Sequence, residues 1–212
     1  MAYQSIWYFS DLPKDVVEIL DRDLYTRFDN EMDESRLHGD TIDKNKRNSK
    51  NAWIPTNHWI SGFLWHYIQK ANRDNFLYDL SHIDAEKLQY TRYEKGEYYN
   101  WHKDTGIALN YEPKINEILA GDSVDNKEVH LDYLNQKTEY VRKLSFTLQL
   151  SEPTDYRGGE VEFLDSGGKR FLAPKQRGTM IVFDSRTRHR VRKIKSGIRK
   201  SIVGWVVGPR WK

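Results

Sequence analysis

A histidine and an aspartate that stand one residue apart, His102 and Asp104, are the side chains in this sequence best suited to chemistry. The residues around them have the pattern of a β-strand, and positions i and i+2 of a strand point to the same face. The imidazole and the carboxylate would then project into one cavity, where they could hold a metal ion. Taken alone, a pair at this spacing is more often a surface pair than a site.

A third ligand has to come from elsewhere in the chain, and His189 is the candidate. It opens a predicted strand behind the apolar run 180–183. Two histidines and one carboxylate on one side of a metal leave about three coordination positions open, which is typical of non-heme Fe(II) oxygenases that bind a cosubstrate and O2 together. The chain has no cysteine, so thiolate metal sites, disulfides and thiol nucleophiles are excluded.

Arg199 is the candidate for binding an anionic ligand beside the metal. A turn near residues 195–197 is expected to join its strand to the strand of His189 as an antiparallel neighbour, so that Arg199 faces the His189 region. A guanidinium can grip a dicarboxylate through two charge-assisted hydrogen bonds. Ser201, on the same face of the strand, could add a hydroxyl donor. The alternative is an outward-pointing charge in a basic strand; the predicted metal ligands favour the binding role.

The elements that must position these residues begin with two predicted helices. Asp11 is expected to cap a helix over residues 12–28. The helical spacing of apolar residues predicts a second helix over residues 59–72. The residues expected to face inward are Val17, Leu20, Leu24, Ile60, Phe63, Leu64, Tyr67, Ile68 and Ala71.

Short β-rich segments follow from residue 86 onward, separated by turn signals such as Gly158-Gly159 and Asp165-Ser166-Gly167-Gly168. Eight such strands after a helical start predict an α+β fold. Its core would be a double-stranded β-helix of the jelly-roll or cupin-like type, with the N-terminal helices packed on one sheet. The 212 residues are expected to form one domain, with 1–85 as a helical support region and 86–212 as the jelly-roll core.

The formal net charge of +3 conceals an uneven distribution. Residues 1–40 carry ten acidic and four basic side chains, whereas residues 185–212 carry ten Lys and Arg and no Asp or Glu. A basic C-terminal face could attract anions; the simpler interpretation is a solvated strand edge kept soluble by charge. No apolar run approaches the roughly 20 residues of a membrane span and no signal peptide is evident, so we expect a soluble cytoplasmic protein without a membrane partner.

Together these residues resemble the 2-oxoglutarate/Fe(II)-dependent dioxygenase superfamily. They are most similar to its prolyl 4-hydroxylase-like branch, found in bacteria, phages and animals, so a bacterial or phage origin is expected. The resemblance covers residues 88–212. The matching segments are the tyrosine-rich approach 93–104, 142–145 with Leu150, 156–160, Gly178-Thr179, Phe183, 189–191, 197–199, Trp205 and Gly208-Pro209.

The resemblance implies that His102, Asp104 and His189 bind Fe(II) and that Arg199 binds the distal carboxylate of 2-oxoglutarate. The implied reaction consumes O2 and 2-oxoglutarate, releases succinate and CO2, and hydroxylates an unactivated C–H bond, with ascorbate as a further reductant. The carboxylate of Asp104 favours hydroxylation, because related halogenases replace it so that halide can bind.

The resemblance also gives roles to aromatic residues. It implies that Tyr93 lines the cosubstrate pocket and that Tyr99 and Trp205 lie beside the metal, although plain core packing would explain either tyrosine equally well. Some prolyl hydroxylases have a tyrosine where this chain has a glutamine, so the second contact to the distal carboxylate is left open. The candidates for that contact are Gln149, Thr147 and Ser201.

A prolyl residue of a protein or peptide is the substrate that the resemblance favours, with a small molecule as the other option. Specificity is expected from the N-terminal third, which carries a weak Arg47-x-Ser49…Trp53 match, and the charged stretch 107–142 is predicted to be a substrate-covering loop. Three other functions stay open. They are a nucleic-acid repair dioxygenase, which the basic tail suits but the spacing of Arg199 from His189 does not, a non-catalytic cupin-like metal-binding module, and a hydrolytic zinc enzyme.

Overall fold

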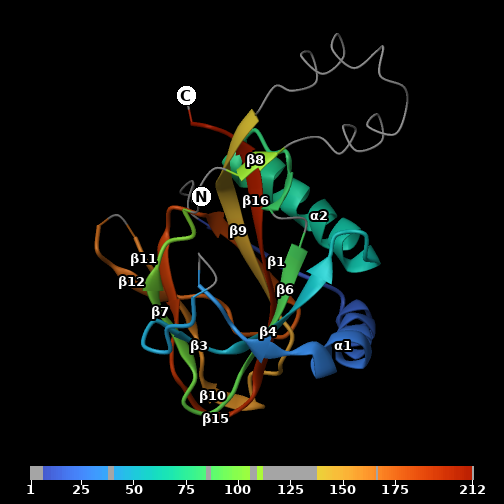
Figure 1. Ribbon diagram of the computed structural model, residues 1–212, viewed down its shortest axis with the longest axis vertical. Helices are drawn as coiled ribbons and strands as arrows, with labels where there is room; N and C mark the ends of the chain where they lie inside the picture. Colours follow the sequence, from blue (N-terminus) through green and yellow to red (C-terminus); the bar gives the residue numbers. More distant parts are fainter. Residues whose placement is uncertain are drawn as a thin grey trace, which may run out of the picture.

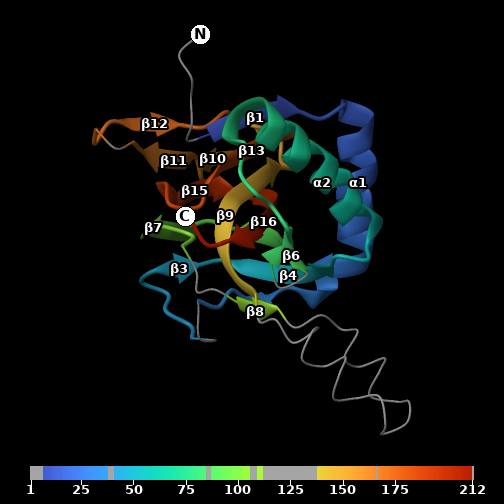
Figure 2. The ribbon, with the colours of Figure 1, turned by 90° about the horizontal axis from the view of Figure 1, so that it is seen from above.

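Two antiparallel β-sheets face each other and enclose the predicted site residues (Figure 1, Figure 2). The structure is a computed structural model that describes residues 7–37, 41–84, 87–105, 109–111, 138–165 and 167–211. Strands of these residues form a nine-stranded major sheet, a five-stranded minor sheet and a two-stranded ribbon. The prediction of a double-stranded β-helix core with helices packed on one sheet is confirmed.

The major sheet joins strands from both halves of the chain. In spatial order it contains β1 (Trp7–Asp11), β13 (Thr179–Asp184), β9 (Thr138–Gln149), β16 (Arg199–Pro209), β6 (Lys87–Tyr93), β4 (Lys50–Pro55) and β2 (Asp33–Glu34). Two short strands lie off this path: β5 (His82–Ile83) pairs with β16, and β8 (Leu109–Tyr111) pairs with β9.

The minor sheet carries the two predicted histidine ligands. In spatial order it contains β12 (Arg170–Leu172), β11 (Val161–Leu164), β14 (Arg188–Val191), β7 (Tyr98–His102) and β3 (Arg47–Asn48). The separate two-stranded ribbon consists of β10 (Tyr156–Gly158) and β15 (Ile194–Gly197). In the sequence, β15 follows β14 of the minor sheet and precedes β16 of the major sheet.

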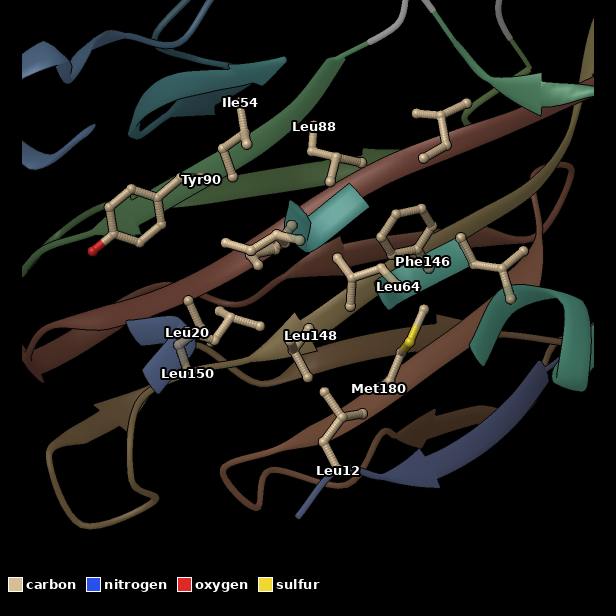
Figure 3. Packing of buried hydrophobic residues seen from close by; sticks show 14 of the residues in the cluster. Leu12, Leu20, Ile54, Leu64, Leu88, Tyr90, Phe146, Leu148, Leu150 and Met180 are labelled. Atoms are coloured by element: carbon tan, nitrogen blue, oxygen red, sulfur yellow. The ribbon is translucent and has the colours of Figure 1, made fainter. Parts of the chain in front are cut away.

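Two helices, α1 (Lys14–Phe28) and α2 (Trp59–Ala71), cover the outer face of the major sheet (Figure 2). Their inward residues form one apolar cluster with alternate residues of the strands, and Figure 3 shows Leu20, Leu64, Leu148 and Met180 in this layer. The helical spacing was predicted correctly, because Val17, Leu20 and Leu24 of α1 are all buried. A π-helical turn, Asn72–Phe76, continues α2.

Strand alternation assigns opposite roles to the two faces of the major sheet. On β9, Leu144 and Leu148 belong to the apolar cluster beneath the helices. The intervening residues Ser145, Thr147 and Gln149 are buried and polar, and they point to the other face, toward the minor sheet. The sheet therefore has one apolar face that packs on the helices and one polar face that lines the space between the sheets.

The start of α1 differs from the prediction. Pro13, not Asp11, is the N-cap residue, and no side chain in the described part of the chain forms a capping hydrogen bond. Asp11 is the last residue of β1, where it lies opposite Thr179 and accepts a hydrogen bond of 2.9 Å from the Thr179 hydroxyl. The capping prediction was wrong because pairing of β1 with β13 holds Asp11 in the sheet.

The first 85 residues contribute more than helices. Strand β1 extends the major sheet beside β13, β4 extends it beside β6, and β3 extends the minor sheet beside β7. These three strands were not predicted from the sequence. Of the stretch 107–142, the structure describes only 109–111 and 138–142, so the predicted substrate-covering loop lies outside the described residues. Neither helix in the described ranges combines the length and apolar character needed to cross a membrane.

The predicted neighbour of the His189 strand was also wrong. Strands β14 and β16 lie in different sheets. The chain leaves the minor sheet after β14, and the next strand, β15, pairs with β10. Arg199 is opposite Tyr93 of β6 in the major sheet. It reaches the space near His189 from the facing sheet and not from an adjacent strand.

Truncating the helix–sheet layer should destabilise the framework of the site. Leu64 of α2 is fully buried, and removal of a buried leucine side chain costs about 2–5 kcal/mol. We expect Leu64→Ala to lower the free energy of unfolding by that amount in urea denaturation. His66→Ala changes an exposed position of the same helix and should shift the midpoint little; equal losses for the two variants would contradict the packing described above.

Candidate metal centre

The side chains of His102, Asp104 and His189 converge. One nitrogen or oxygen atom from each lies within 4.8 Å of the others. The carboxylate stands between the imidazoles: its Oδ1 is 3.5 Å from Nε2 of His102, and its Oδ2 is 3.5 Å from Nε2 of His189. Three donor atoms at this spacing can bind a single metal ion from one side.

The pairing of β7 with β14 brings the two histidines together. His102 is the last residue of β7 and is the cross-strand partner of His189. The register then shifts, so that Val191 is opposite Tyr99. A bulge of this kind adds a residue to one strand and re-aims its side chains, which lets Tyr99 and His102 both point into the space between the sheets.

Asp104 is not held by the strand, contrary to the same-face argument from its spacing. It lies two residues beyond the end of β7. Its backbone N–H donates to the carbonyl of Ser185 at 2.9 Å, and the Ser145 hydroxyl donates to its carboxylate. Contacts with the major sheet therefore hold this candidate ligand. Asp104 lies beside the histidines because of these tertiary contacts and not because of alternation along a strand.

Both histidines are oriented through their second ring nitrogen. Nδ1 of His102 lies 2.7 Å from the carbonyl oxygen of Asn100, and Nδ1 of His189 lies 3.0 Å from that of Thr187. A carbonyl only accepts, so Nδ1 carries the proton and Nε2 presents a lone pair. Metal-binding histidines are commonly held in this way by a backbone carbonyl.

The electrostatics keep His102 and Asp104 in protonation states that can bind a metal. Burial and the neighbouring His189 lower the pKa of His102 to about 4, so its imidazole is neutral near pH 7. Burial raises the pKa of Asp104, but His189 and His102 oppose it and the net shift is downward. A neutral imidazole and an ionised carboxylate are the forms that bind a cation.

Arg199 is buried across the same space, with only 1% of its surface exposed. Its Nη2 donates to Oε1 of Gln149 at 2.9 Å and its Nη1 donates to the Ser201 hydroxyl at 3.2 Å. Its Nε and the hydroxyl of Thr147 have no hydrogen-bond partner, and no carboxylate of the described residues pairs with the guanidinium. A buried charge of this kind is costly unless paired, so these groups fit an anionic ligand.

The predicted aromatic residues line the same cavity. Tyr99 stacks on His102 with a centroid distance of 3.5 Å and an interplanar angle of 15°. Burial raises the pKa of Tyr99 to about 12, which keeps its hydroxyl protonated. Tyr93 is buried with its ring 5.5 Å from Cζ of Arg199, and the buried indole N–H of Trp205 has no hydrogen-bond partner among the described residues. Of the ten predicted site residues, eight line the cavity. The other two, Gln149 and Ser201, lie behind Arg199 and accept hydrogen bonds from its guanidinium.

Arg47, which had no predicted role, lies at the mouth of this cavity. It is 6% exposed, its Nε donates to the Ser49 hydroxyl at 3.0 Å, and its Nη2 donates to Oε1 of Gln89 at 3.1 Å. Its Cζ is 4.9 Å from the ring centroid of Tyr99. The weak Arg47-x-Ser49 pattern was the only signal in the sequence, and its meaning depends on the pairing of β3 with β7.

An outer groove of about 590 Å³ opens onto the cavity. Both spaces are bordered by Arg47, Gln89, Tyr99, Asp104 and Trp205, so the groove is continuous with the metal centre. The remaining lining comes largely from the N-terminal third, including Glu31, Asp33, Glu34, Arg36 and Trp53. A molecule in the groove could therefore reach the metal centre past Arg47.

Comparison with known proteins agrees with this geometry. A sequence profile of the 2OG-Fe(II) oxygenase superfamily matches residues 88–207. A PKHD-type hydroxylase of Parvibaculum lavamentivorans is 43% identical over 63 residues, 30% of this chain and 28% of that protein. Another, from Rippkaea orientalis, is 30% identical over 119 residues, 56% of this chain and 41% of that protein. The matched segment spans less than half the length of these curated relatives.

Solved structures share the fold. A prolyl-4-hydroxylase of Pseudomonas putida has a TM-score of 0.66 at 20% identity, covering 98% of this chain and 94% of that one. A Trichoplax adhaerens prolyl hydroxylase, solved with a peptide fragment of hypoxia inducible factor, has a TM-score of 0.69 at 16% identity, covering 97% and 84%. A carbocyclase from nogalamycin biosynthesis also matches, with a TM-score of 0.63 at 11% identity over 96% and 80%.

Removing the central carboxylate should weaken metal binding strongly. We expect Asp104→Ala to weaken Co(II) binding by at least about a hundredfold, since even groups that only support a metal ligand contribute about 10–100-fold. A titration followed by visible absorption measures this without turnover. Asp23→Ala is the matched control, because Asp23 also pairs with a histidine, His58 at 3.3 Å, outside the cavity. Unchanged Co(II) affinity in Asp104→Ala would remove this residue from the metal site.

Proposed function

The chain belongs to the 2OG-Fe(II) oxygenase superfamily, and from that premise we propose that it hydroxylates an unactivated C–H bond, with a prolyl residue of a protein or peptide as the first candidate substrate. One observation supports this above the others. A two-histidine, one-carboxylate cluster shares a cavity with a buried arginine that has no carboxylate partner among the described residues. A non-catalytic metal-binding module would have no use for that arginine.

In this proposal His102, Asp104 and His189 hold Fe(II). The bound iron supplies the O2 chemistry that couples decarboxylation of 2-oxoglutarate, giving succinate and CO2, to hydroxylation of the substrate. The protein contributes the positions. The carbonyl groups of Asn100 and Thr187 fix both imidazoles, and Tyr99 covers one face of His102.

Arg199 binds the distal carboxylate of 2-oxoglutarate in the same proposal. Its Nε–H and the hydroxyl of Thr147 have no partner within the described ranges, and a carboxylate would satisfy both. Gln149 and Ser201 already accept hydrogen bonds from the guanidinium, so they orient it. Tyr93 borders the guanidinium with its ring and excludes water from that side.

The outer groove is proposed as the entry and binding site of the primary substrate. It leads to Asp104 past Arg47 and Tyr99 and has room for a chain segment, at about 590 Å³. The relatives that suggest a peptide are the Trichoplax adhaerens prolyl hydroxylase, which was solved with a peptide fragment, and the Pseudomonas putida prolyl-4-hydroxylase. Both share the fold at 20% identity or less, so the assay below includes other substrates.

The function is tested by succinate release with Fe(II), O2, ascorbate and 2-oxoglutarate. Proline-containing peptides, free amino acids and other metabolites are supplied in turn, and mass spectrometry looks for a product that has gained one oxygen atom. Because a carbocyclase shares the fold, a product that has lost two hydrogens without gaining oxygen would replace hydroxylation with ring closure or desaturation. No succinate from the wild-type protein under any condition would reject the oxygenase proposal.

Arg199→Ala should impair the use of 2-oxoglutarate specifically. Loss of one partner of a buried charged pair costs about 2–5 kcal/mol, so the 2-oxoglutarate affinity of the metal-loaded protein should fall at least about thirtyfold by calorimetry. Co(II) binding should be retained. The control is Arg192→Ala, an arginine of the same basic segment whose side chain is 45% exposed. Wild-type affinity in Arg199→Ala would show that the distal carboxylate binds elsewhere.

Arg47→Met should act on the primary substrate instead. The change removes a charge that contacts Ser49, Gln89 and Tyr99 at the cavity mouth. Hydrogen bonds to charged groups contribute about 1.5–3 kcal/mol, so KM for the best substrate of the panel should rise at least about tenfold while the affinity for 2-oxoglutarate stays the same. A loss of 2-oxoglutarate affinity equal to that of Arg199→Ala would place Arg47 in the cosubstrate pocket.

A further inference from the structure

The outer face of the minor sheet carries a cluster of arginines around one tryptophan. The Trp101 patch consists of Trp101, Arg170, Arg188 and Arg190. The guanidinium carbons of the three arginines lie 5.7, 5.9 and 4.7 Å from the ring centroid of Trp101. This face lies at the side of the molecule opposite α1 and α2 (Figure 1, Figure 2), and it has no part in the proposed reaction.

Strand geometry aims these side chains outward. His189 of β14 points into the cavity, so its neighbours Arg188 and Arg190 point to the opposite face. The register shift between β7 and β14 breaks the alternation on β7 and brings Trp101 to the same outer face. Arg170 of β12 lies opposite Leu164, whose other cross-strand partner is Arg188. The two exposed arginines thus share one row across the sheet.

One arginine of the patch is fixed and two are available. Arg190 donates from Nε to Glu162 at 2.6 Å and packs against the indole, which makes it part of a rigid platform. Arg170 and Arg188 are exposed, and in the ranges that the structure describes neither forms an ion pair. The patch therefore presents two uncompensated guanidiniums beside a half-buried aromatic ring.

Protection of a sheet edge does not account for this arrangement. Charged residues commonly guard edge strands against pairing with other chains. Of the three strands that carry the Trp101 patch, only β12 lies at an edge of the minor sheet, whereas β14 and β7 are interior strands. Two of the arginines and the tryptophan therefore lie where no edge needs protection.

We propose that the Trp101 patch binds single-stranded nucleic acid. Guanidinium groups bind phosphates, and flat aromatic and guanidinium surfaces stack with bases whatever the sequence. An acidic peptide would satisfy the charges but would leave the flat ring surface unused, so the combination favours a nucleic acid strand. The excess of basic residues in 185–212, with ten Lys and Arg and no acid, adds long-range attraction for the same ligand.

The proposal is tested by the anisotropy of a fluorescein-labelled oligothymidylate over a range of salt concentrations. The slope of log affinity against log salt is about −0.7 per phosphate neutralised on a single strand. We expect the double variant Arg170→Ala/Arg188→Ala to flatten the slope by about 1.4 and to weaken binding at least about tenfold. Trp101→Ala should also weaken binding about tenfold through lost stacking.

The matched control is Lys14→Ala/Arg22→Ala, which removes two exposed basic residues from α1 and lowers the net charge equally. It should leave binding close to wild type. Equal weakening in both double variants would overturn the proposal, because net charge alone would then explain binding. So would the absence of binding at low salt, or tighter binding of a glutamate-rich peptide that is lost in Arg170→Ala/Arg188→Ala. None of these outcomes bears on the succinate-release assay, so this proposal and the oxygenase proposal can fail independently.

Discussion

The free-energy cost of removing charged side chains from water is the main physical constraint on the residues between the two sheets. Asp104 and Arg199 are both buried there, and Arg47 is buried at its mouth. Groups of this kind remain charged in a protein interior only where other polar groups compensate them. The imidazoles compensate the carboxylate from two sides, while the guanidinium of Arg199 has only neutral partners among the described residues. That imbalance makes the cavity suited to an anion, and the proposed cosubstrate is a dianion.

The framework keeps these polar groups in place because the opposite face of the major sheet is apolar. Leu144, Leu148 and Met180 pack beneath the helices. The buried polar residues that alternate with them along the strands are therefore held on the face that lines the cavity. Rigidity of this kind matters at a metal centre, where ligands must stay in position before the ion binds. Helix–sheet packing thus supports the site from behind, although none of the described residues that line the cavity belongs to α1 or α2.

The two sheets divide the tasks. The minor sheet supplies both histidines through the pairing of β7 with β14, and its outer face carries the Trp101 patch. The major sheet supplies Arg199 and anchors Asp104 through Ser145 and Ser185. Short strands from the N-terminal third border the groove that leads inward.

Local pattern was enough to predict the two helices, eight strands from residue 86 onward, the double-sheet core and the candidate residues, since the spacing of apolar side chains and the order His102, Asp104, His189, Arg199 are properties of the chain itself. It gave wrong reasons for two of those residues: Asp104 lies past its strand, and Arg199 approaches from the facing sheet. It also gave no role to Arg47 and no sign of the Trp101 patch. These features depend on which strands pair and where the register shifts. Strand pairing is set by contacts between residues far apart in the chain, which short-range periodicity does not encode.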